Sequence, residues 1–165
     1  MWKSGAQLGD TIKLIRNRLR RHPYPMTIIL HAGTNDVFDN NTYTMRQMVH
    51  SVLHGIRQIL PSTRILWSDV LPRLFFYGER KAGRGRRITH FINAQAHKFI
   101  GEMDNAGFII HAAVFPVRNF GLFHYDCIHL STEGYIVFRM HLAEALLFFN
   151  SHCQAKVFPP LLEGI

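Results

Sequence analysis

An aspartate and a histidine stand three residues apart, at Asp126 and His129, shortly before the last helical pattern of the chain. At this spacing a carboxylate and an imidazole on one turn of backbone can form a hydrogen bond. Asp126 would then fix the tautomer of His129 and leave its other ring nitrogen free as a general base. The pair therefore predicts the proton-transfer chemistry of acyl transfer.

A second polar motif, Gly33-Thr34-Asn35-Asp36, follows an apolar segment upstream. The amide of Asn35 can donate a hydrogen bond to the oxyanion that forms when a carbonyl is attacked. Each motif also has a purely structural interpretation. Asn35 and Asp36 can form an Asx turn between a strand and a helix, and Asp126 can cap a turn that leaves His129 on the surface.

The two motifs, in this order, resemble two signature blocks of the SGNH (GDSL-type) hydrolase family, GxND at 33–36 and DxxH at 126–129. The resemblance implies a serine esterase mechanism with Asp126 and His129 as catalytic residues and Asn35 in the oxyanion hole. Gly33 and Asp36 are the supporting residues of the GxND block. Residues 3–6 look like a further block, whose glycine, Gly5 here, lends a backbone N–H to the oxyanion. The resemblance implies no metal and no organic cofactor.

The nucleophilic serine of that family belongs to a Gly-Asp-Ser block after the first strand, and no such block precedes the other motifs. Gly9-Asp10-Thr11 imitates it, but no apolar strand comes before it, so helix-start chemistry explains it better. Ser68 is expected inside a strand and Ser131 at a helix cap. Cys127 lies inside the DxxH turn and cannot easily face its own histidine.

We therefore expect the nucleophile to lie outside this chain, which would be inactive as given. Two explanations stay open: a truncated sequence, or a degenerate relative that has lost catalysis. The resemblance also implies a flavodoxin-like sheet whose first strand is missing. An open sheet edge of this kind favours oligomerisation.

The elements that must position these residues alternate between strand and helix patterns, with polar motifs after the strands. This alternation predicts an α/β fold, a three-layer α/β/α sandwich with a parallel sheet and function at the carboxyl ends of the strands. We expect one domain, incomplete at its N-terminus, over residues 1–152, and a loosely attached tail over 153–165. Strands are expected at 26–30, 64–70 and 108–114, and helices at 7–21, from Thr42 or Thr44 to 60, at 88–104 before Gly107, and from Ser131 or Thr132 onward.

The composition, 47% hydrophobic and 18% charged, is typical of a packed globular protein. No apolar run approaches the roughly 20 residues that span a bilayer, and no secretion signal opens the chain. These features predict an intracellular, cytoplasmic protein without a membrane span. His50 and His54 share a helix face, but no third metal ligand accompanies them.

The formal net charge of +8 would favour an anionic partner. Two hypotheses follow: an esterase-like domain that takes a small ester or acyl substrate, or a catalytically dead binding module whose basic face holds nucleic acid or an anionic surface. Basic residues gather in two clusters, one on the first helix and one in a glycine-containing loop: Arg16, Arg18, Arg20 and Arg21, and Arg80, Lys81, Arg84, Arg86 and Arg87.

Overall fold

The computed structural model describes residues 6–37, 40–73, 79–116 and 119–160 of the chain. Strands and helices alternate through these residues, as the sequence pattern predicts. The strands are β1 (Thr27–Leu30), β2 (Arg64–Ser68), β3 (Ala106–Ile109) and β4 (Val157–Phe158). The helices are α1 (Thr11–Leu19), α2 (Thr42–Ile59), α3 (Glu79–Glu102) and α4 (Thr132–Ser151), with short 3-10 helices η1 (Leu8–Asp10), η2 (Thr34–Asp36) and η3 (Phe120–Leu122).

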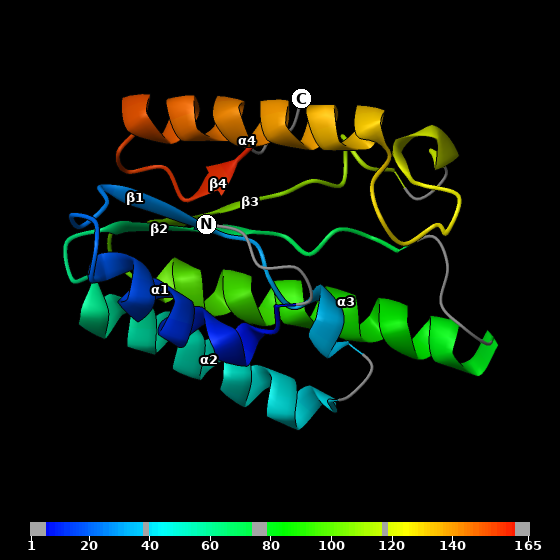
Figure 1. The fold of residues 1–165 in the computed structure, drawn as a ribbon, viewed down its shortest axis with the longest axis horizontal. Coiled ribbons are helices and arrows are strands. Elements are labelled where there is room, and N and C mark those ends of the chain that lie inside the picture. The colour runs from blue at the N-terminus through cyan, green and yellow to red at the C-terminus, as the bar shows by residue number, and fades with distance from the viewer. Residues whose placement is uncertain (1–5, 38–39, 74–78, 117–118, 161–165) are drawn as a thin grey trace.

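The four strands form one parallel sheet in the order β1-β2-β3-β4. Helices α1, α2 and α3 cover one face of this sheet and α4 covers the other (Figure 1). The predicted three-layer α/β/α sandwich is therefore confirmed. In a parallel sheet all carboxyl ends lie at one edge, so the segments that follow β1, β2 and β3 meet there.

Strand β2 lies inside the sheet, and its side chains alternate between the two layers. Ile65 and Trp67 pack into the apolar cluster formed with α1, α2 and α3. Leu66 packs on the opposite face, against Phe149 of α4. All five residues of β2 are buried. By the same alternation Ser68 faces α4, and this orientation matters for the site described below.

Arg64, at the start of β2, is buried under the end of α4. Its Nη2 donates to the carbonyl oxygens of Cys153 at 2.9 Å and Ala155 at 3.0 Å. Its guanidinium carbon lies 4.9 Å from the ring centre of Phe149. Its Nη1 donates to the carbonyl oxygen of Phe149 at 2.5 Å. Because the carbonyls in the last turn of a helix have no intrahelical donors, Arg64 supplies a donor to a buried acceptor of α4.

The start of each long helix has an identifiable cap. The Asn41 side chain accepts from the N–H of Thr44 at 2.9 Å, so the cap of α2 is Asn41 rather than the predicted Thr42 or Thr44. The Ser131 hydroxyl accepts from the N–H of Gly134 at 3.1 Å, which confirms the predicted start of α4.

Three local expectations were wrong. Helix α3 begins at Glu79, where a glycine-containing loop was expected, because the Arg, Lys and Ala residues around Gly83 are strong helix formers and that glycine lies in open space. Strand β3 ends at Ile109, since the carbonyl of His111 accepts from Val114 and Phe115 and turns the chain. Gly107, expected after a helix, lies within β3.

The C-terminal segment was expected to be loosely attached, yet residues 157–158 form β4. The N–H of Phe108 donates to the carbonyl of Lys156 at 2.9 Å, and the N–H of Ile110 donates to that of Phe158 at 2.7 Å. The described part of the tail, through residue 160, is thus tied to the sheet. A two-residue strand carries no hydrophobic period, so the sequence pattern could not reveal it.

Strand β1 is at one edge of the sheet and pairs with β2 alone among the described strands. Its expected role in oligomerisation stays a prediction. In the described part of the chain, no helix has both the length and the apolar content needed to cross a membrane.

Candidate active site

The predicted Asp126–His129 hydrogen bond is present. Asp126 Oδ2 lies 2.6 Å from Nδ1 of His129. The other carboxylate oxygen accepts from the backbone N–H groups of Ile128 and His129, each at 2.9 Å. The hydrogen bond to the imidazole has the largest effect and the two backbone hydrogen bonds add to it, and together they hold the pKa of Asp126 well below its usual range. The carboxylate is therefore charged at neutral pH and orients the ring.

This turn has a tight backbone, with Cys127 in the left-handed region at φ 56°. The His129 side chain is 77% exposed and that of Asp126 is 28% exposed. Nε2 of His129 makes no hydrogen bond with any described residue. The two backbone N–H groups that Asp126 accepts from are the capping contacts expected if the turn were purely structural. Asp126 therefore both caps the turn and orients an imidazole whose second nitrogen is available.

Gly33 and Asp36 shape the loop after β1. Gly33 has φ +109°, a conformation that disfavours residues with a Cβ. Asp36 is fully buried and its Oδ2 accepts from the N–H of Leu8 at 3.0 Å. Asp36 therefore ties the start of the first helical segment to the loop and does not line the cavity described below.

Asn35 is exposed, and two contacts orient its amide. The side-chain nitrogen donates to the carbonyl of Ala6 at 3.0 Å, and the side-chain oxygen accepts from Nη2 of Arg73 at 3.4 Å. An amide nitrogen has two hydrogens, so one remains for another acceptor. Nη2 of Arg73 also donates to the carbonyl of Thr34 at 3.0 Å. Arg73 was not singled out from the sequence, where it is one arginine after a strand.

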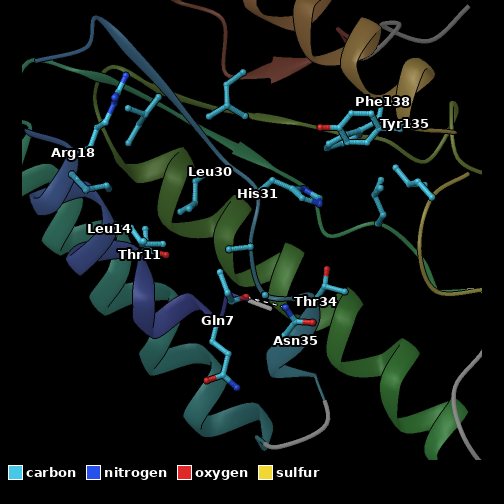
Figure 2. A pocket seen from close by; sticks show the side chains of 18 of the residues that line it. Gln7, Thr11, Leu14, Arg18, Leu30, His31, Thr34, Asn35, Tyr135 and Phe138 are labelled. Atoms are coloured by element: carbon cyan, nitrogen blue, oxygen red, sulfur yellow. Dashed lines mark hydrogen bonds between the residues drawn. The ribbon is translucent and has the colours of Figure 1, made fainter. Parts of the chain in front are cut away.

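Asn35 and His129 line one cavity of about 1030 Å³. It extends along β1, between α1 on one side and the region around α4 on the other (Figure 2). Its walls are mainly apolar, with polar side chains near the carboxyl ends of the strands and others, Arg18 and His22, near the end of α1. The wall includes Leu14, Leu30, His31, Asn35, Arg73, His129 and Phe138.

Among the described serines, none bonds to the imidazole of His129. Ser68 is fully buried, and Ser131 is engaged with Gly121 and Gly134. The thiol of Cys127 points to the carbonyl of Tyr125 at 3.8 Å. Gly5, the predicted second oxyanion residue, lies outside the described residues.

Ser68 nevertheless has imidazole partners, which sequence reasoning missed. Its Oγ lies 3.0 Å from Nδ1 of His31 and 2.7 Å from Nε2 of His111. Nδ1 of His111 in turn lies 2.9 Å from Nδ1 of His141. These four residues, which we term the histidine relay, come from the ends of β1, β2 and β3 and from α4. The one available signal was that His31, Ser68 and His111 each lie at or just after a strand end.

The two basic clusters do not form one surface. Arg16, Arg18, Arg20 and Arg21 are exposed at and just beyond the end of α1, and Arg84, Arg86 and Arg87 are exposed near the start of α3. These segments lie at opposite ends of the helical layer (Figure 1). The side chains of Arg80 and Lys81 lie outside the described part. The described side chains also contain no group of three or more metal-ligating residues.

No family model matches the chain, and no curated protein matches it. It is similar to a solved structure from Streptococcus pneumoniae, of a protein proposed to be a platelet activating factor. The superposition has a TM-score of 0.67 at 18% identity and covers 86% of this chain and 69% of that chain. At this identity the likeness shows a shared α/β fold.

Proposed function

We propose that this chain is the SGNH hydrolase-like part of an acyl ester hydrolase. The observation that carries the proposal is the 2.6 Å bond between Asp126 and His129, with His129 and Asn35 on the wall of one cavity. An oriented imidazole with a free nitrogen can serve as the general base of acyl transfer, and an amide side chain on the wall of the same cavity can donate to an oxyanion.

In the proposed reaction, Nε2 of His129 takes the proton of a hydroxyl as its oxygen attacks the ester carbonyl. Asp126 keeps the Nδ1 hydrogen in place and stabilises the imidazolium. The second amide hydrogen of Asn35 donates to the oxyanion. The imidazolium then gives its proton to the departing alcohol, and water repeats the sequence to release the acid.

The reaction needs a hydroxyl close to Nε2 of His129. No described serine occupies that position, so the proposal assigns the nucleophile to a serine that is not among the described residues. The apolar walls at Leu14, Leu30 and Phe138 favour an ester with an apolar acyl or alcohol group.

Labelling with an alkyl fluorophosphonate tests this assignment, because an activated serine hydroxyl attacks the phosphorus of the reagent, displaces fluoride and becomes phosphonylated. The whole gene product should be labelled on one serine, as located by mass spectrometry of its peptides. His129→Ala should abolish labelling, whereas His124→Ala, which removes a neighbouring exposed imidazole, should not. Unlabelled wild-type protein, or equal labelling of both variants, would contradict the proposal.

A further inference from the structure

His31 lies on the wall of the same cavity as Asn35 and His129, with the histidine relay behind it. Figure 2 shows its ring among the side chains around the cavity, together with those of Leu30 and Phe138. The His31 ring centre is 4.8 Å from that of Phe138. Its Nδ1 is engaged with Ser68, while Nε2 makes no hydrogen bond with any described residue.

Burial keeps the rings of the relay neutral. Loss of solvent lowers the pKa of His31 to about 4 and, with the help of the two neighbouring imidazoles, lowers that of His111 to about 3. Burial also lowers the pKa of His141, which nearby Glu144 partly offsets. Each neutral imidazole has one nitrogen that donates and one that accepts.

The hydroxyl of Ser68 couples the tautomers of these rings. Ser68 is fully buried, and its Oγ has only the rings of His31 and His111 as partners among the described residues. A buried hydroxyl hydrogen without an acceptor would cost about 1–3 kcal/mol. The favoured arrangements are therefore those in which Ser68 accepts from one ring and donates to the other.

Two arrangements satisfy the whole relay. In the first, His141 donates to His111, His111 donates to Ser68 and Ser68 donates to Nδ1 of His31, so Nε2 of His31 carries a hydrogen. In the second, every bond is reversed and Nε2 of His31 is an acceptor. The first becomes the second when one proton leaves Nε2 of His31 and one enters at Nε2 of His141, so the total charge is unchanged.

We propose that His31 is a ligand-contacting residue of this cavity, and that the relay lets its Nε2 either donate to or accept from a bound ligand. The ligand class is a small, mainly apolar molecule with one hydroxyl or carbonyl group, because the wall around His31 is apolar. Ser68 and His111 are positioning residues that act through His31. The proposal does not depend on ester hydrolysis, since it requires only that the cavity binds such a molecule.

The test compares two probes. Cyclohexanone can only accept a hydrogen bond, whereas the hydroxyl of phenol donates a hydrogen bond more strongly than it accepts one. Two-bond ¹⁵N–¹H correlation spectra of histidine-labelled protein report which nitrogen of each ring carries the hydrogen. With cyclohexanone, His31 should carry it on Nε2, and with phenol on Nδ1. The tautomer of His111 should switch together with that of His31.

Ser68→Ala removes the coupling hydroxyl. In this variant His31 should still respond to the probes, but His111 should no longer follow. If the alanine variant folds poorly, Ser68→Cys takes its place. The thiol is close in size to the hydroxyl but is a much weaker hydrogen-bond donor, so the coupling between His31 and His111 should weaken. Thr63→Ala is the matched control. Thr63 is also buried, directly precedes β2 in the sequence, and donates its hydroxyl to the carbonyl oxygen of Pro25 at 2.6 Å, outside the relay.

Three outcomes would overturn the proposal. The first is that neither probe changes the His31 signals at saturating concentration. The second is that His111 keeps one tautomer with both probes in the wild-type protein. The third is that His111 still follows His31 in both Ser68 variants. None of these results bears on whether His129 supports hydrolysis, so the two proposals can fail separately.

Discussion

Nη2 of Arg73 lies 3.4 Å from the side-chain oxygen of Asn35, on the wall of the cavity. The amide of an asparagine can turn by half a revolution and exchange its oxygen and nitrogen. Arg73 binds the oxygen and Ala6 binds one hydrogen of the nitrogen, so the two contacts together select one orientation. Arg73 thus positions the group that we assign to the oxyanion.

Replacing Arg73 should impair turnover more than substrate binding. Arg73→Gln removes the charged donor, so the Asn35 amide should be free to turn and kcat should fall by about tenfold or more, with a smaller change in KM. Steady-state ester hydrolysis by the whole gene product measures both constants. Arg46→Gln, at an exposed position of α2, is the control, and an equal effect of the two changes would count against this role.

Arg64 should be essential for the attachment of α4 and β4. Arg64→Met keeps a long side chain but removes the donor to the buried carbonyl of Phe149, along with those to Cys153 and Ala155, so the free energy of unfolding should fall by about 3 kcal/mol. Urea denaturation followed by circular dichroism measures this loss. Arg46→Met should change the free energy of unfolding by less than about 0.5 kcal/mol. Similar values for the two variants would refute the role of Arg64.

Gly107 allows α4 to approach the sheet. A Cβ at this position would lie 2.7 Å from the ring of Phe149 and 3.1 Å from the carbonyl oxygen of Lys156. Gly107→Ala should therefore destabilise the protein by about 1–3 kcal/mol. Gly83→Ala, where a Cβ would meet nothing within 4 Å, should instead stabilise α3 slightly. Thermal denaturation of the two variants gives the signs, and a stabilised Gly107→Ala protein would contradict the packing.

Acid should destabilise the fold through the relay histidines. His31 and His111 have folded pKa values of about 4 and about 3, below the ordinary 6.5, so the unfolded chain binds more protons in this window. Stability should thus fall as pH decreases from about 6.5 toward 4, by on the order of 2 kcal/mol or more. Asp126 affects stability in a lower pH range. Its pKa is lowered in the folded state, so the stability that it contributes is lost only as the pH falls below 3.8, the pKa of an aspartate in the unfolded chain.

Denaturation curves between pH 7 and pH 4 measure this dependence. In His111→Gln the slope of stability against pH should be shallower, whatever the absolute stability of the variant. His90→Gln, at an exposed position of α3, controls for the loss of an imidazole. A slope in His111→Gln that equals the wild-type slope would exclude His111 as a source of the acid sensitivity.

The sequence predicted the fold class because β1, β2 and β3 each lie in a short, mainly apolar segment that is followed by turn residues. It also placed Asp126 beside His129, since the two residues are three positions apart on one turn and their contact depends on local backbone geometry alone. The start of α3 was missed because Gly83 and Gly85 suggested a loop, whereas the surrounding residues propagate a helix. Strand β4 is too short to have a recognisable period.

The histidine relay could not be predicted, because it depends on which strands are neighbours and which face each residue occupies. Ser68 was placed correctly in a strand, but its two imidazole partners follow two other strands, and the third imidazole of the relay, that of His141, comes from α4 and bonds to His111. The same reason explains why Arg73 was missed. Contacts between distant segments require the register and layering that the structure supplies.

In the proposed ester hydrolase, His129, oriented by Asp126, is the general base. Hydrolysis of p-nitrophenyl acetate by the whole gene product, compared among wild type, His129→Ala and His124→Ala, tests this role most directly. We predict a loss of kcat/KM of at least about 100-fold in His129→Ala and little change in His124→Ala. An inert wild-type protein, or a His129→Ala variant as active as wild type, would contradict the claim.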